Sequence, residues 1–376
     1  MPAQGFKSQA FLRRLGPVIV LLGVWVLFAI LTKGIFLTPR NFSNLMRQAA
    51  INGIIAVGMT LVLITGQIDL SVGAMVGLAG MAAVYVQVAW HAGLVLSLLT
   101  GIGVGLASGI LQGSLTAYGR IPSYVVTLGG LLVWRGIAKA LSGGTTYPVA
   151  ARDFKGMGQA YLTPGEGIVV LILGIALAVW IAVRQNQQRV AKGELAWSPF
   201  AFLGKVLVPA VTLAAIVLGL NEYAGVPVPV LIFAIIALII AFVLQGSSFG
   251  QSLYTLGAKT GESAAIENPA NIVWAFAILG VLTGLAGMIY AARLGSAGPE
   301  AGTLLEIDVI AACVIGGVSL AGGRGAILGA CLGAVVTASI DNGMSLRNVP
   351  DYAQYIVKGI VLVAAVGIST LSRRRN

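Results

Sequence analysis

Carboxylates inside apolar stretches are the first residues of this sequence with a potential for chemistry, because they are scarce. The chain has 376 residues but only 12 Asp and Glu. Asp69 lies in the segment 65–73 (TGQIDLSVG), which joins two apolar runs with almost no polar loop. A carboxylate near membrane depth is costly and is usually paired or functional. Two interpretations are equally good: a tight turn in which Ser71 and Asp69 begin the next helix, or a discontinuous helix that lines a pathway.

The other reactive residue types are too few for the common catalytic and metal sites. His91 is the single histidine, and the two cysteines, Cys313 and Cys331, lie within apolar runs. These counts exclude a disulfide framework and a four-cysteine zinc site. The sequence has no Gly-x-x-x-x-Gly-Lys-Ser/Thr loop, so no ATPase of the common kind is expected. We therefore predict a protein that is not an enzyme, with no catalytic residues, no metal site and no cofactor bound by this chain.

The composition indicates a protein that lies mostly within a membrane. Hydrophobic residues make up 58% of the chain and charged residues 9%, whereas soluble domains are roughly 45–50% apolar and about 25% charged. The mean hydropathy of +0.95 agrees with this assignment. The net charge of +11 is not accompanied by a basic groove with interleaved aromatic residues, so we expect no nucleic-acid partner.

Twelve apolar runs approach the length of about 20 residues that a helix needs to cross a bilayer core. They are 17–36, 49–66, 70–90, 93–118, 122–141, 166–183, 201–220, 228–244, 271–292, 304–320, 325–341 and 353–371. In lipid the backbone polar groups must be paired within the chain, which favours helices. The predicted fold class is therefore all-α, a polytopic transmembrane helical bundle of about 12 spans, or about 10 if one pair of runs is re-entrant.

Basic residues between the runs predict the orientation. With the N-terminus in the cytoplasm, Lys and Arg on that side outnumber those outside by about two to one, as the positive-inside rule requires. We therefore expect both termini to be cytoplasmic. Lys358 lies inside the last run, and we expect its ammonium group to extend to the interface.

Glycine is a second excess, with 51 residues. Gly101, Gly105 and Gly109 recur every four residues, and Gly280 and Gly284 do the same in a later run. Small residues let membrane helices approach closely, so helix packing is the first interpretation. The alternative is that some glycines mark bends or pathway walls in broken helices.

A polar segment, 245–271, separates two apolar runs on the side assigned to the cytoplasm. Within this segment a short helix is expected, for which Glu262, Ala264 and Ala265 are suitable residues. Gly257 would precede the helix and Pro269 would follow it. The residues alone leave two interpretations open, an amphipathic connector and a docking element for a soluble partner.

A third group of polar and glycine-rich segments lies in the C-terminal part. Residues 293–300 would form an outer loop, and Glu306 and Asp308 open the next apolar run, where acids favour a helix N-terminus. The stretch 316–325 is rich in glycine, and 341–343 (DNG) ends a span. These segments are either turns or places where the backbone must bend tightly or approach another chain.

These constellations, in this order, resemble those of the bacterial ABC sugar permease family that serves ribose, xylose and related monosaccharides. The matching segments cover most of the chain outside its middle: 65–73, 121–129 followed by Arg135-Gly136, 249–265, 291–325, 341–343 and 354–359. Each motif is weak alone, but together and in register they are specific.

The resemblance implies a single ABC importer transmembrane domain over 1–376 that forms a homodimer in the bacterial inner membrane. Cytoplasmic ABC ATPase subunits would dock below it, and a periplasmic sugar-binding protein would dock above it. ATP and Mg²⁺ would act on the separate ATPase. The outer loops expected to receive the binding protein are 37–48, 293–303 and 342–352.

The resemblance also favours docking as the role of the polar cytoplasmic segment. Residues 245–270 look like the coupling loop of the family, with the motif positions Gly257, Glu262, Ala264 and Ala265. The following residues, 266–269 (IENP), depart from the more familiar Arg-Leu-Ser-Gly type of ending, which puts the exact ATPase contacts there in doubt.

The middle of the chain separates the subfamilies. Ribose-type permeases look as though they lack the two extra apolar runs, 166–183 and 201–220, that are present here. The longer form is more like the xylose permease, so D-xylose is the expected substrate, with ribose or another sugar as the alternative. A sugar in transit needs weak polar contacts. The candidate pathway residues are Gln67, Asp69, Ser71 and Asn342.

A secondary active transporter is the alternative from another class. Such a protein normally hides ionisable residues in mid-span, and Asp69 is the one persuasive candidate in the sequence. The segment 245–270 has no role in that scheme.

Overall fold

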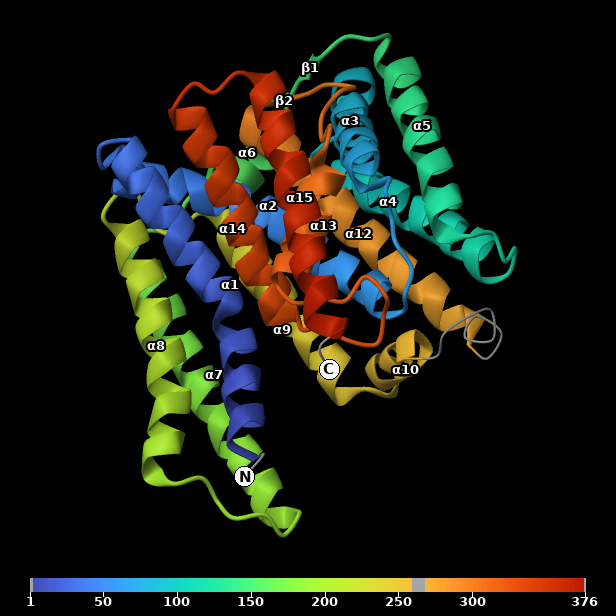
Figure 1. The fold of residues 1–376 in the computed structure, drawn as a ribbon. Helices are drawn as coiled ribbons and strands as arrows, with labels where there is room; N and C mark the ends of the chain where they lie inside the picture. Colours follow the sequence, from blue (N-terminus) through green and yellow to red (C-terminus); the bar gives the residue numbers. More distant parts are fainter. Residues whose placement is uncertain (1–2, 259–267, 375–376) are drawn as a thin grey trace.

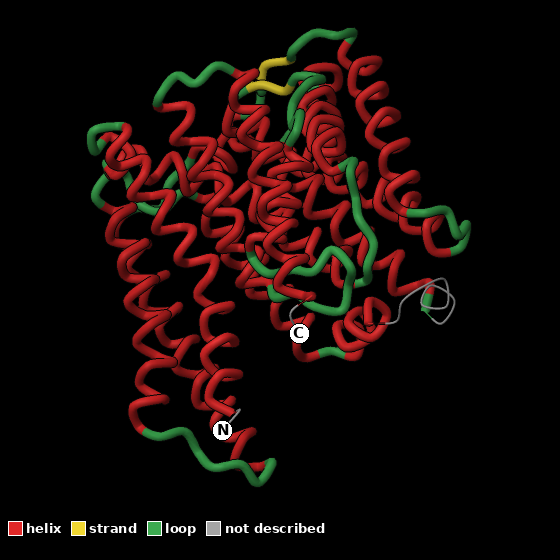
Figure 2. Tube along the Cα trace, viewed as in Figure 1, coloured by secondary structure: helices red, strands yellow, loops and turns green. Residues whose placement is uncertain are grey.

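The computed structural model describes residues 3–258 and 268–374, which are mostly helical (Figure 1). The helices are α1 (Ala3–Leu31), α2 (Pro39–Ile64), α3 (Val72–Trp90), α4 (Leu94–Ala117), α5 (Ser123–Ser142), α6 (Arg152–Gln159), α7 (Pro164–Ala191), α8 (Pro199–Asn221), α9 (Val228–Gly246), α10 (Ser248–Ala258), α12 (Pro269–Leu294), α13 (Leu305–Ile315), α14 (Ile327–Leu346) and α15 (Asp351–Arg374). A short 3-10 helix, η1 (Ile35–Leu37), and one antiparallel strand pair, β1 (Tyr147–Pro148) with β2 (Ser296–Ala297), complete the described elements. Figure 2 shows the predominance of helix, and the predicted all-α class is confirmed.

Ten helices of the described chain are long and apolar enough to cross a membrane. The apolar part of α1, Gly16–Leu31, is shorter. The ten long helices agree with the lower end of the predicted range of about 10 to 12 spans. In Figure 1, the first turns of α1 and the last turns of α15 both lie toward the lower part of the molecule.

Residues 65–71 form a largely buried, non-helical connection between α2 and α3. The N–H of Ile68 donates to Ser123 Oγ and the N–H of Leu70 donates to Thr127 Oγ1, each at 3.1 Å. The first turns of α5 thus satisfy backbone groups that lipid could not. The connection is longer than a tight turn, and whether it lines a pathway stays a prediction.

A second interruption precedes α13. After the outer strand pair, residues 298–304 turn back into the protein, where Arg135 of α5 donates to the carbonyls of Pro299 (2.7 Å) and Ala301 (2.8 Å). With 11 residues, α13 is about 16 Å long, too short for a bilayer core of about 30 Å. The prediction of one helical span over 304–320 is therefore wrong, because turns precede α13 and the helix stops at Ile315.

The two interrupted passages meet at the starts of α3 and α13. A Cβ on Gly73 would overlap the carbonyl of Gly302, and a Cβ on Gly302 would overlap the carbonyl of Gly73. The Glu306 carboxylate lies against Gly73 at the same place. Helix N-termini carry partial positive charge, so the N-termini of α3 and α13 both attract this carboxylate.

Glycine packing holds α4 against α12 in the core. Gly105 and Gly280 face each other so closely that a Cβ on either would overlap the backbone of the other. Gly101 meets Gly284 one turn away, and Gly109 meets the carbonyl of Phe276. The helix-packing interpretation of this glycine spacing is confirmed, because the close approach replaces side-chain burial with backbone contact.

The pair α7 and α8 forms a hairpin at one side of the molecule (Figure 1). Only 11% of the apolar window of α7 and 6% of that of α8 is buried in the chain, compared with 89% for α2. These helices contain the two extra apolar runs, 166–183 and 201–220. Most of their surface faces away from the rest of the chain.

Candidate functional site: a polar cavity between α2 and the C-terminal helices

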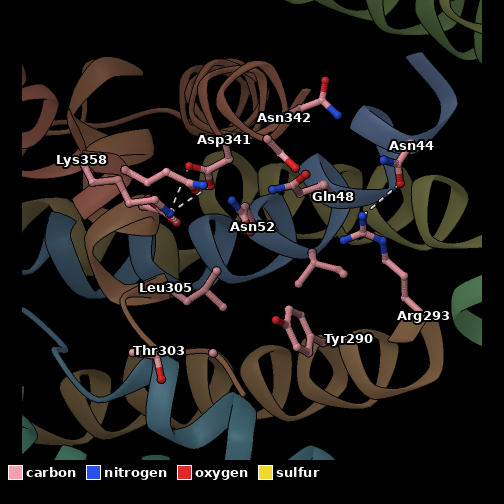
Figure 3. A pocket seen from close by; sticks show the side chains of 15 residues that line it. Asn44, Gln48, Asn52, Tyr290, Arg293, Thr303, Leu305, Asp341, Asn342 and Lys358 are labelled. Atoms are coloured by element: carbon pink, nitrogen blue, oxygen red, sulfur yellow. Dashed lines mark hydrogen bonds and ion pairs between the residues drawn. The ribbon is translucent and has the colours of Figure 1, made fainter. Parts of the chain in front are cut away.

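A cavity of ≈ 340 Å³ lies between α2, the end of α12, residues 302–308, α14 and α15 (Figure 3). This volume falls in the range in which proteins hold small ligands, roughly 300–1,000 Å³. Most of its lining is polar, although it lies among apolar helices. Because uncompensated polar groups are costly among apolar helices, a cavity with such a lining is suited to a polar ligand.

Five amide side chains line the cavity. Three come from α2 at four-residue spacing, Asn44, Gln48 and Asn52, and the others are Asn342 of α14 and Gln354 of α15. Residues four apart lie on one face of a helix, so α2 presents a continuous amide stripe. An amide both donates and accepts hydrogen bonds, which makes the set complementary to a ligand with several hydroxyl groups.

An ion cluster forms one end of the cavity. The Nζ of Lys358 on α15 lies 2.6 Å from Asp308 Oδ2 on α13 and 3.1 Å from Asp341 on α14. The Lys358 side chain is only 16% exposed. The prediction that Lys358 extends to the interface is therefore wrong, since two carboxylates from neighbouring helices hold its ammonium group inside the protein. The pairing offsets part of the cost of placing three charges there.

A second cation lies at the other end of the cavity. Arg293, in the last turn of α12, donates to Asn44 Oδ1 at 3.0 Å, and Tyr290 lines the cavity one turn earlier. Figure 3 shows the amides of α2 between Arg293 and Lys358. The cavity therefore offers hydrogen-bonding groups between two fixed charges, with Tyr290 as a flat apolar surface.

Of the four predicted pathway residues, Asn342 alone lies at this cavity. It exchanges two hydrogen bonds with Asn41, of 2.8 and 3.0 Å. Asp69 and Ser71 lie elsewhere, buried together, and Gln67 is half-buried beside them. The role of these four residues in transport stays a prediction.

The structure gives Asp69 a local partner at the start of α3. Its Oδ1 accepts from both the N–H and the Oγ of Ser71, each at 2.7 Å, and the Gln112 amide of α4 contacts Ser71 Oγ at 2.8 Å. The carboxylate thus compensates the free N–H groups at a buried helix start.

The amide stripe of α2 was missed by the sequence interpretation. The segment 37–48 was expected to be an outer loop, but α2 already begins at Pro39, so that expectation is wrong for most of the segment. Likewise α14 continues to Leu346, inside the expected loop 342–352. The four-residue spacing of Asn44, Gln48 and Asn52 was the available signal, and it becomes visible only if the helix is started before the hydrophobic run.

Comparisons with known proteins show the family of this chain. The family model described as "Branched-chain amino acid transport system / permease component" matches residues 41–366. The Xylose transport system permease protein XylH of Haemophilus influenzae is 40% identical over 358 residues, covering 94% of both chains. XylH of Escherichia coli K12 is 38% identical, covering 96% of this chain and 92% of its own. The Ribose import permease protein RbsC of the same strain is 31% identical, covering 96% and 95%.

The chain belongs to the ABC sugar permeases of the ribose and xylose type. It is accordingly a multi-pass protein of the bacterial inner membrane and a transport subunit. No solved structure matches it.

In this permease, the predicted coupling position Gly257 ends α10 in close contact with two other segments. A Cβ on Gly257 would overlap the Ile64 carbonyl at the end of α2 and approach the Gly323 N–H, which itself donates to Ile64 at 2.8 Å. Tyr254 of α10 donates to the Gly325 carbonyl at 2.7 Å. Glycine is required at 257 because no side chain fits between these backbones.

The other predicted coupling residues of the permease, Glu262, Ala264 and Ala265, lie outside the described residues. What the structure describes is the anchor of the predicted loop 245–270, where α10 is attached to the end of α2 and to the loop 316–326. Both segments lead to the cavity, since α2 carries the amide stripe and the loop follows α13.

Proposed function

We propose that this permease is the membrane subunit of an importer that moves a monosaccharide, D-xylose first, across the bacterial inner membrane. The observation that carries the substrate class is the amide-lined cavity, because its donors and acceptors suit a ligand rich in hydroxyl groups. The similarity to two xylose permeases, at 40% and 38% identity, supports xylose before ribose.

The proposed assembly contains two copies of this chain, two cytoplasmic ATPase subunits and a periplasmic sugar-binding protein. ATP and Mg²⁺ bind to the ATPase, and this chain binds no cofactor. Sugar released by the binding protein enters from the outer side, where the strand pair and the end of α12 lie. The residues 245–270, with Gly257, Glu262, Ala264 and Ala265, receive the motion of the ATPases.

The contacts of α10 supply a route for that motion. A displacement of α10 acts on the end of α2 through Gly257 and on the loop 316–326 through Tyr254. These segments belong to the same packed unit as the cavity, so closure of the ATPases can favour one of two packings of α2 and α13. ATP and the loaded binding protein can each shift the balance between the two packings if each binds the complex more tightly in one packing than in the other.

Two kinds of polar contact are proposed along the pathway. Asn342 and the amides of α2 would bind the sugar weakly and exchange hydrogen bonds with its hydroxyl groups. Gln67, Asp69 and Ser71 would act at the break before α3, where Asp69 holds the helix start in place. Tight binding at either place would slow release of the sugar.

Reconstitution tests the proposal. Purified permease is placed in vesicles with its ATPase and binding protein, and ATP hydrolysis is measured with xylose, ribose, arabinose and glucose in turn. Xylose should stimulate hydrolysis and uptake most, and no stimulation by any monosaccharide would contradict the sugar assignment. Uptake driven by an ion gradient without ATP would favour a secondary transporter instead.

A paired variant tests the cavity within that assay. Gln48→Leu removes one amide from the stripe and should raise the sugar concentration for half-maximal uptake about tenfold, since a lost hydrogen bond costs about 0.5–1.5 kcal/mol. Gln188→Leu, the same change on the exposed cytoplasmic end of α7, should have no effect. Equal behaviour of the two variants would remove Gln48 from the pathway.

A further inference from the structure

The end of the α7–α8 hairpin nearest its connecting loop, residues 180–205, carries an excess of positive charge. Four cations occur there, Arg184, Arg189, Lys192 and Lys205, and the single acid is Glu194. Glu194 pairs with Arg189 at 2.9 Å. Three of the four cations are thus left without an acidic neighbour in this segment. Such a surface is complementary to an anion.

Three of these cations lie over the rings of two tryptophans. The guanidinium of Arg184 lies 4.9 Å from the centre of the Trp180 ring. The Trp197 ring has Arg189 at 5.8 Å and the Nζ of Lys205 at 4.4 Å from its centre. Cations held on aromatic faces keep their remaining N–H groups available for an anion. Because Arg189 lies on α7 and Lys205 on α8, Trp197 brings charges from both helices to one place.

Large apolar side chains stand exposed beside these charges. Leu195 and Phe200, which flank Trp197 in the sequence, are each 89% exposed. Val190 and Leu203 are about half exposed nearby. Within the described chain nothing covers them. A cationic and aromatic surface next to protruding apolar groups is the pattern of a segment that lies in the headgroup region of a bilayer.

We propose that residues 180–205 form a binding site for an anionic phospholipid of the cytoplasmic leaflet. The lipid phosphate lies between Arg189 and Lys205, which share the Trp197 ring, Arg184 adds positive charge to the same segment, and the acyl chains lie along the exposed faces of α7 and α8. Basic pockets between transmembrane helices on the cytoplasmic side bind anionic headgroups in this way. The topology of the chain requires only positive charge here; it does not require tryptophans under the cations or exposed Leu195 and Phe200 beside them.

Native mass spectrometry of the purified permease tests the site. Phosphatidylglycerol and phosphatidylcholine are added in equal amount, and the lipids retained are counted for the wild type and for a variant with Arg184→Gln, Arg189→Gln and Lys205→Gln. The wild type should retain phosphatidylglycerol preferentially. The variant should lose that preference about a hundredfold, since each of its three lost cations would contribute about 1 kcal/mol near anionic lipid.

Matched controls separate a specific site from general positive charge. Arg373→Gln with Arg374→Gln and Arg375→Gln removes the same charge from the C-terminus and should retain phosphatidylglycerol as the wild type does. The triple Arg/Lys→Gln variant should elute as the wild type does in size-exclusion chromatography. Equal lipid loss from both variants would overturn the proposal, as would full retention by the hairpin variant. Displacement of the lipid by inorganic phosphate at equal concentration would also overturn it, because the site would then bind a soluble anion.

Discussion

The interior of this permease and its α7–α8 hairpin both consist of apolar helices, but the helices of the two regions pack in different ways. In the interior, α4 and α12 approach through facing glycines, and α2, α12, α14 and α15 surround a cavity with amides and charges. In the hairpin, α7 and α8 contact mainly each other and expose long apolar side chains. The interior depends on close backbone contact and paired charges, whereas the hairpin needs only an apolar surface.

This difference in packing predicts which positions tolerate substitution. A glycine at a backbone contact cannot gain a side chain without moving a helix, and a buried ion cannot lose its partner without leaving a charge unpaired. A lipid-facing position has neither constraint. The predictions below run from the largest expected effect, in the interior, to the smallest, at the surface.

Lys358→Met should have the largest effect. It leaves Asp308 and Asp341 close together without their cation, and removing one partner of a buried ion pair costs about 3–5 kcal/mol. The thermal unfolding midpoint and sugar uptake of the variant should both fall steeply. Lys33→Met, at an exposed position, is the control and should unfold as the wild type does. An unchanged midpoint for Lys358→Met would show that the cluster does not hold α13, α14 and α15 together.

Gly105→Leu should rank second. The new side chain would overlap the backbone of Gly280, and overpacking of this kind costs about 1–3 kcal/mol. The control is Gly103→Leu on the same helix, where a Cβ meets nothing within 4 Å. Unfolding midpoints of both variants in the same detergent measure the difference. If Gly103→Leu were as unstable as Gly105→Leu, the cause would be helix α4 itself and not its packing on α12.

Gly174→Ala tests the hairpin and should change little. The added Cβ would meet the end of the Leu213 side chain, which can rotate away, and Ala favours a helix over Gly by roughly 0.5–1 kcal/mol. The unfolding midpoint should stay the same or rise. Gly280→Ala, which meets the Gly105 backbone, should lower it. A fall with Gly174→Ala would mean that α7 and α8 pack as tightly as the interior.

Glu300→Gln should have the smallest effect. The Lys139 ammonium, at 2.7 Å, holds the pKa of Glu300 below its usual range, but the side chains are 54% and 64% exposed. An exposed pair contributes about 0.2–1 kcal/mol. Because the folded pKa is lowered, that contribution is present at neutral pH and is lost as the pH falls through the folded pKa. Unfolding of the wild type and the variant should therefore differ slightly at pH 7 and coincide in acid.

Much of the fold could be predicted from the sequence. Hydrophobic length locates most of the spans, and the four-residue spacing of Gly101, Gly105 and Gly109 predicts a packed helix face, because both patterns are local. The prediction fails where an apolar run is not a helix from end to end. The run 304–320 has the hydropathy of a span, but its helix stops at Ile315, and the glycine-rich residues that follow it pack against α2 and α10, which are distant in sequence.

Less of the candidate site could be predicted. Asn342 was found because it interrupts an apolar run. Lys358 was expected to extend to the interface without a partner, since nothing local in the sequence indicates that Asp308 and Asp341 face it. Asn44 and Gln48 were hidden because the hydrophobic run was started too late along α2, and Asn52 inside that run was not singled out.

The sequence by itself determined that this protein is a helical membrane protein and which family it belongs to. These conclusions depend on composition, hydrophobic length and motifs in register, and each is a property of the chain alone. The tertiary structure decided which polar residues share a cavity, which charges pair, and where each helix begins and ends. Those outcomes depend on contacts between residues such as Lys358 and Asp308, 50 positions apart. Local periodicity carries no information about such contacts.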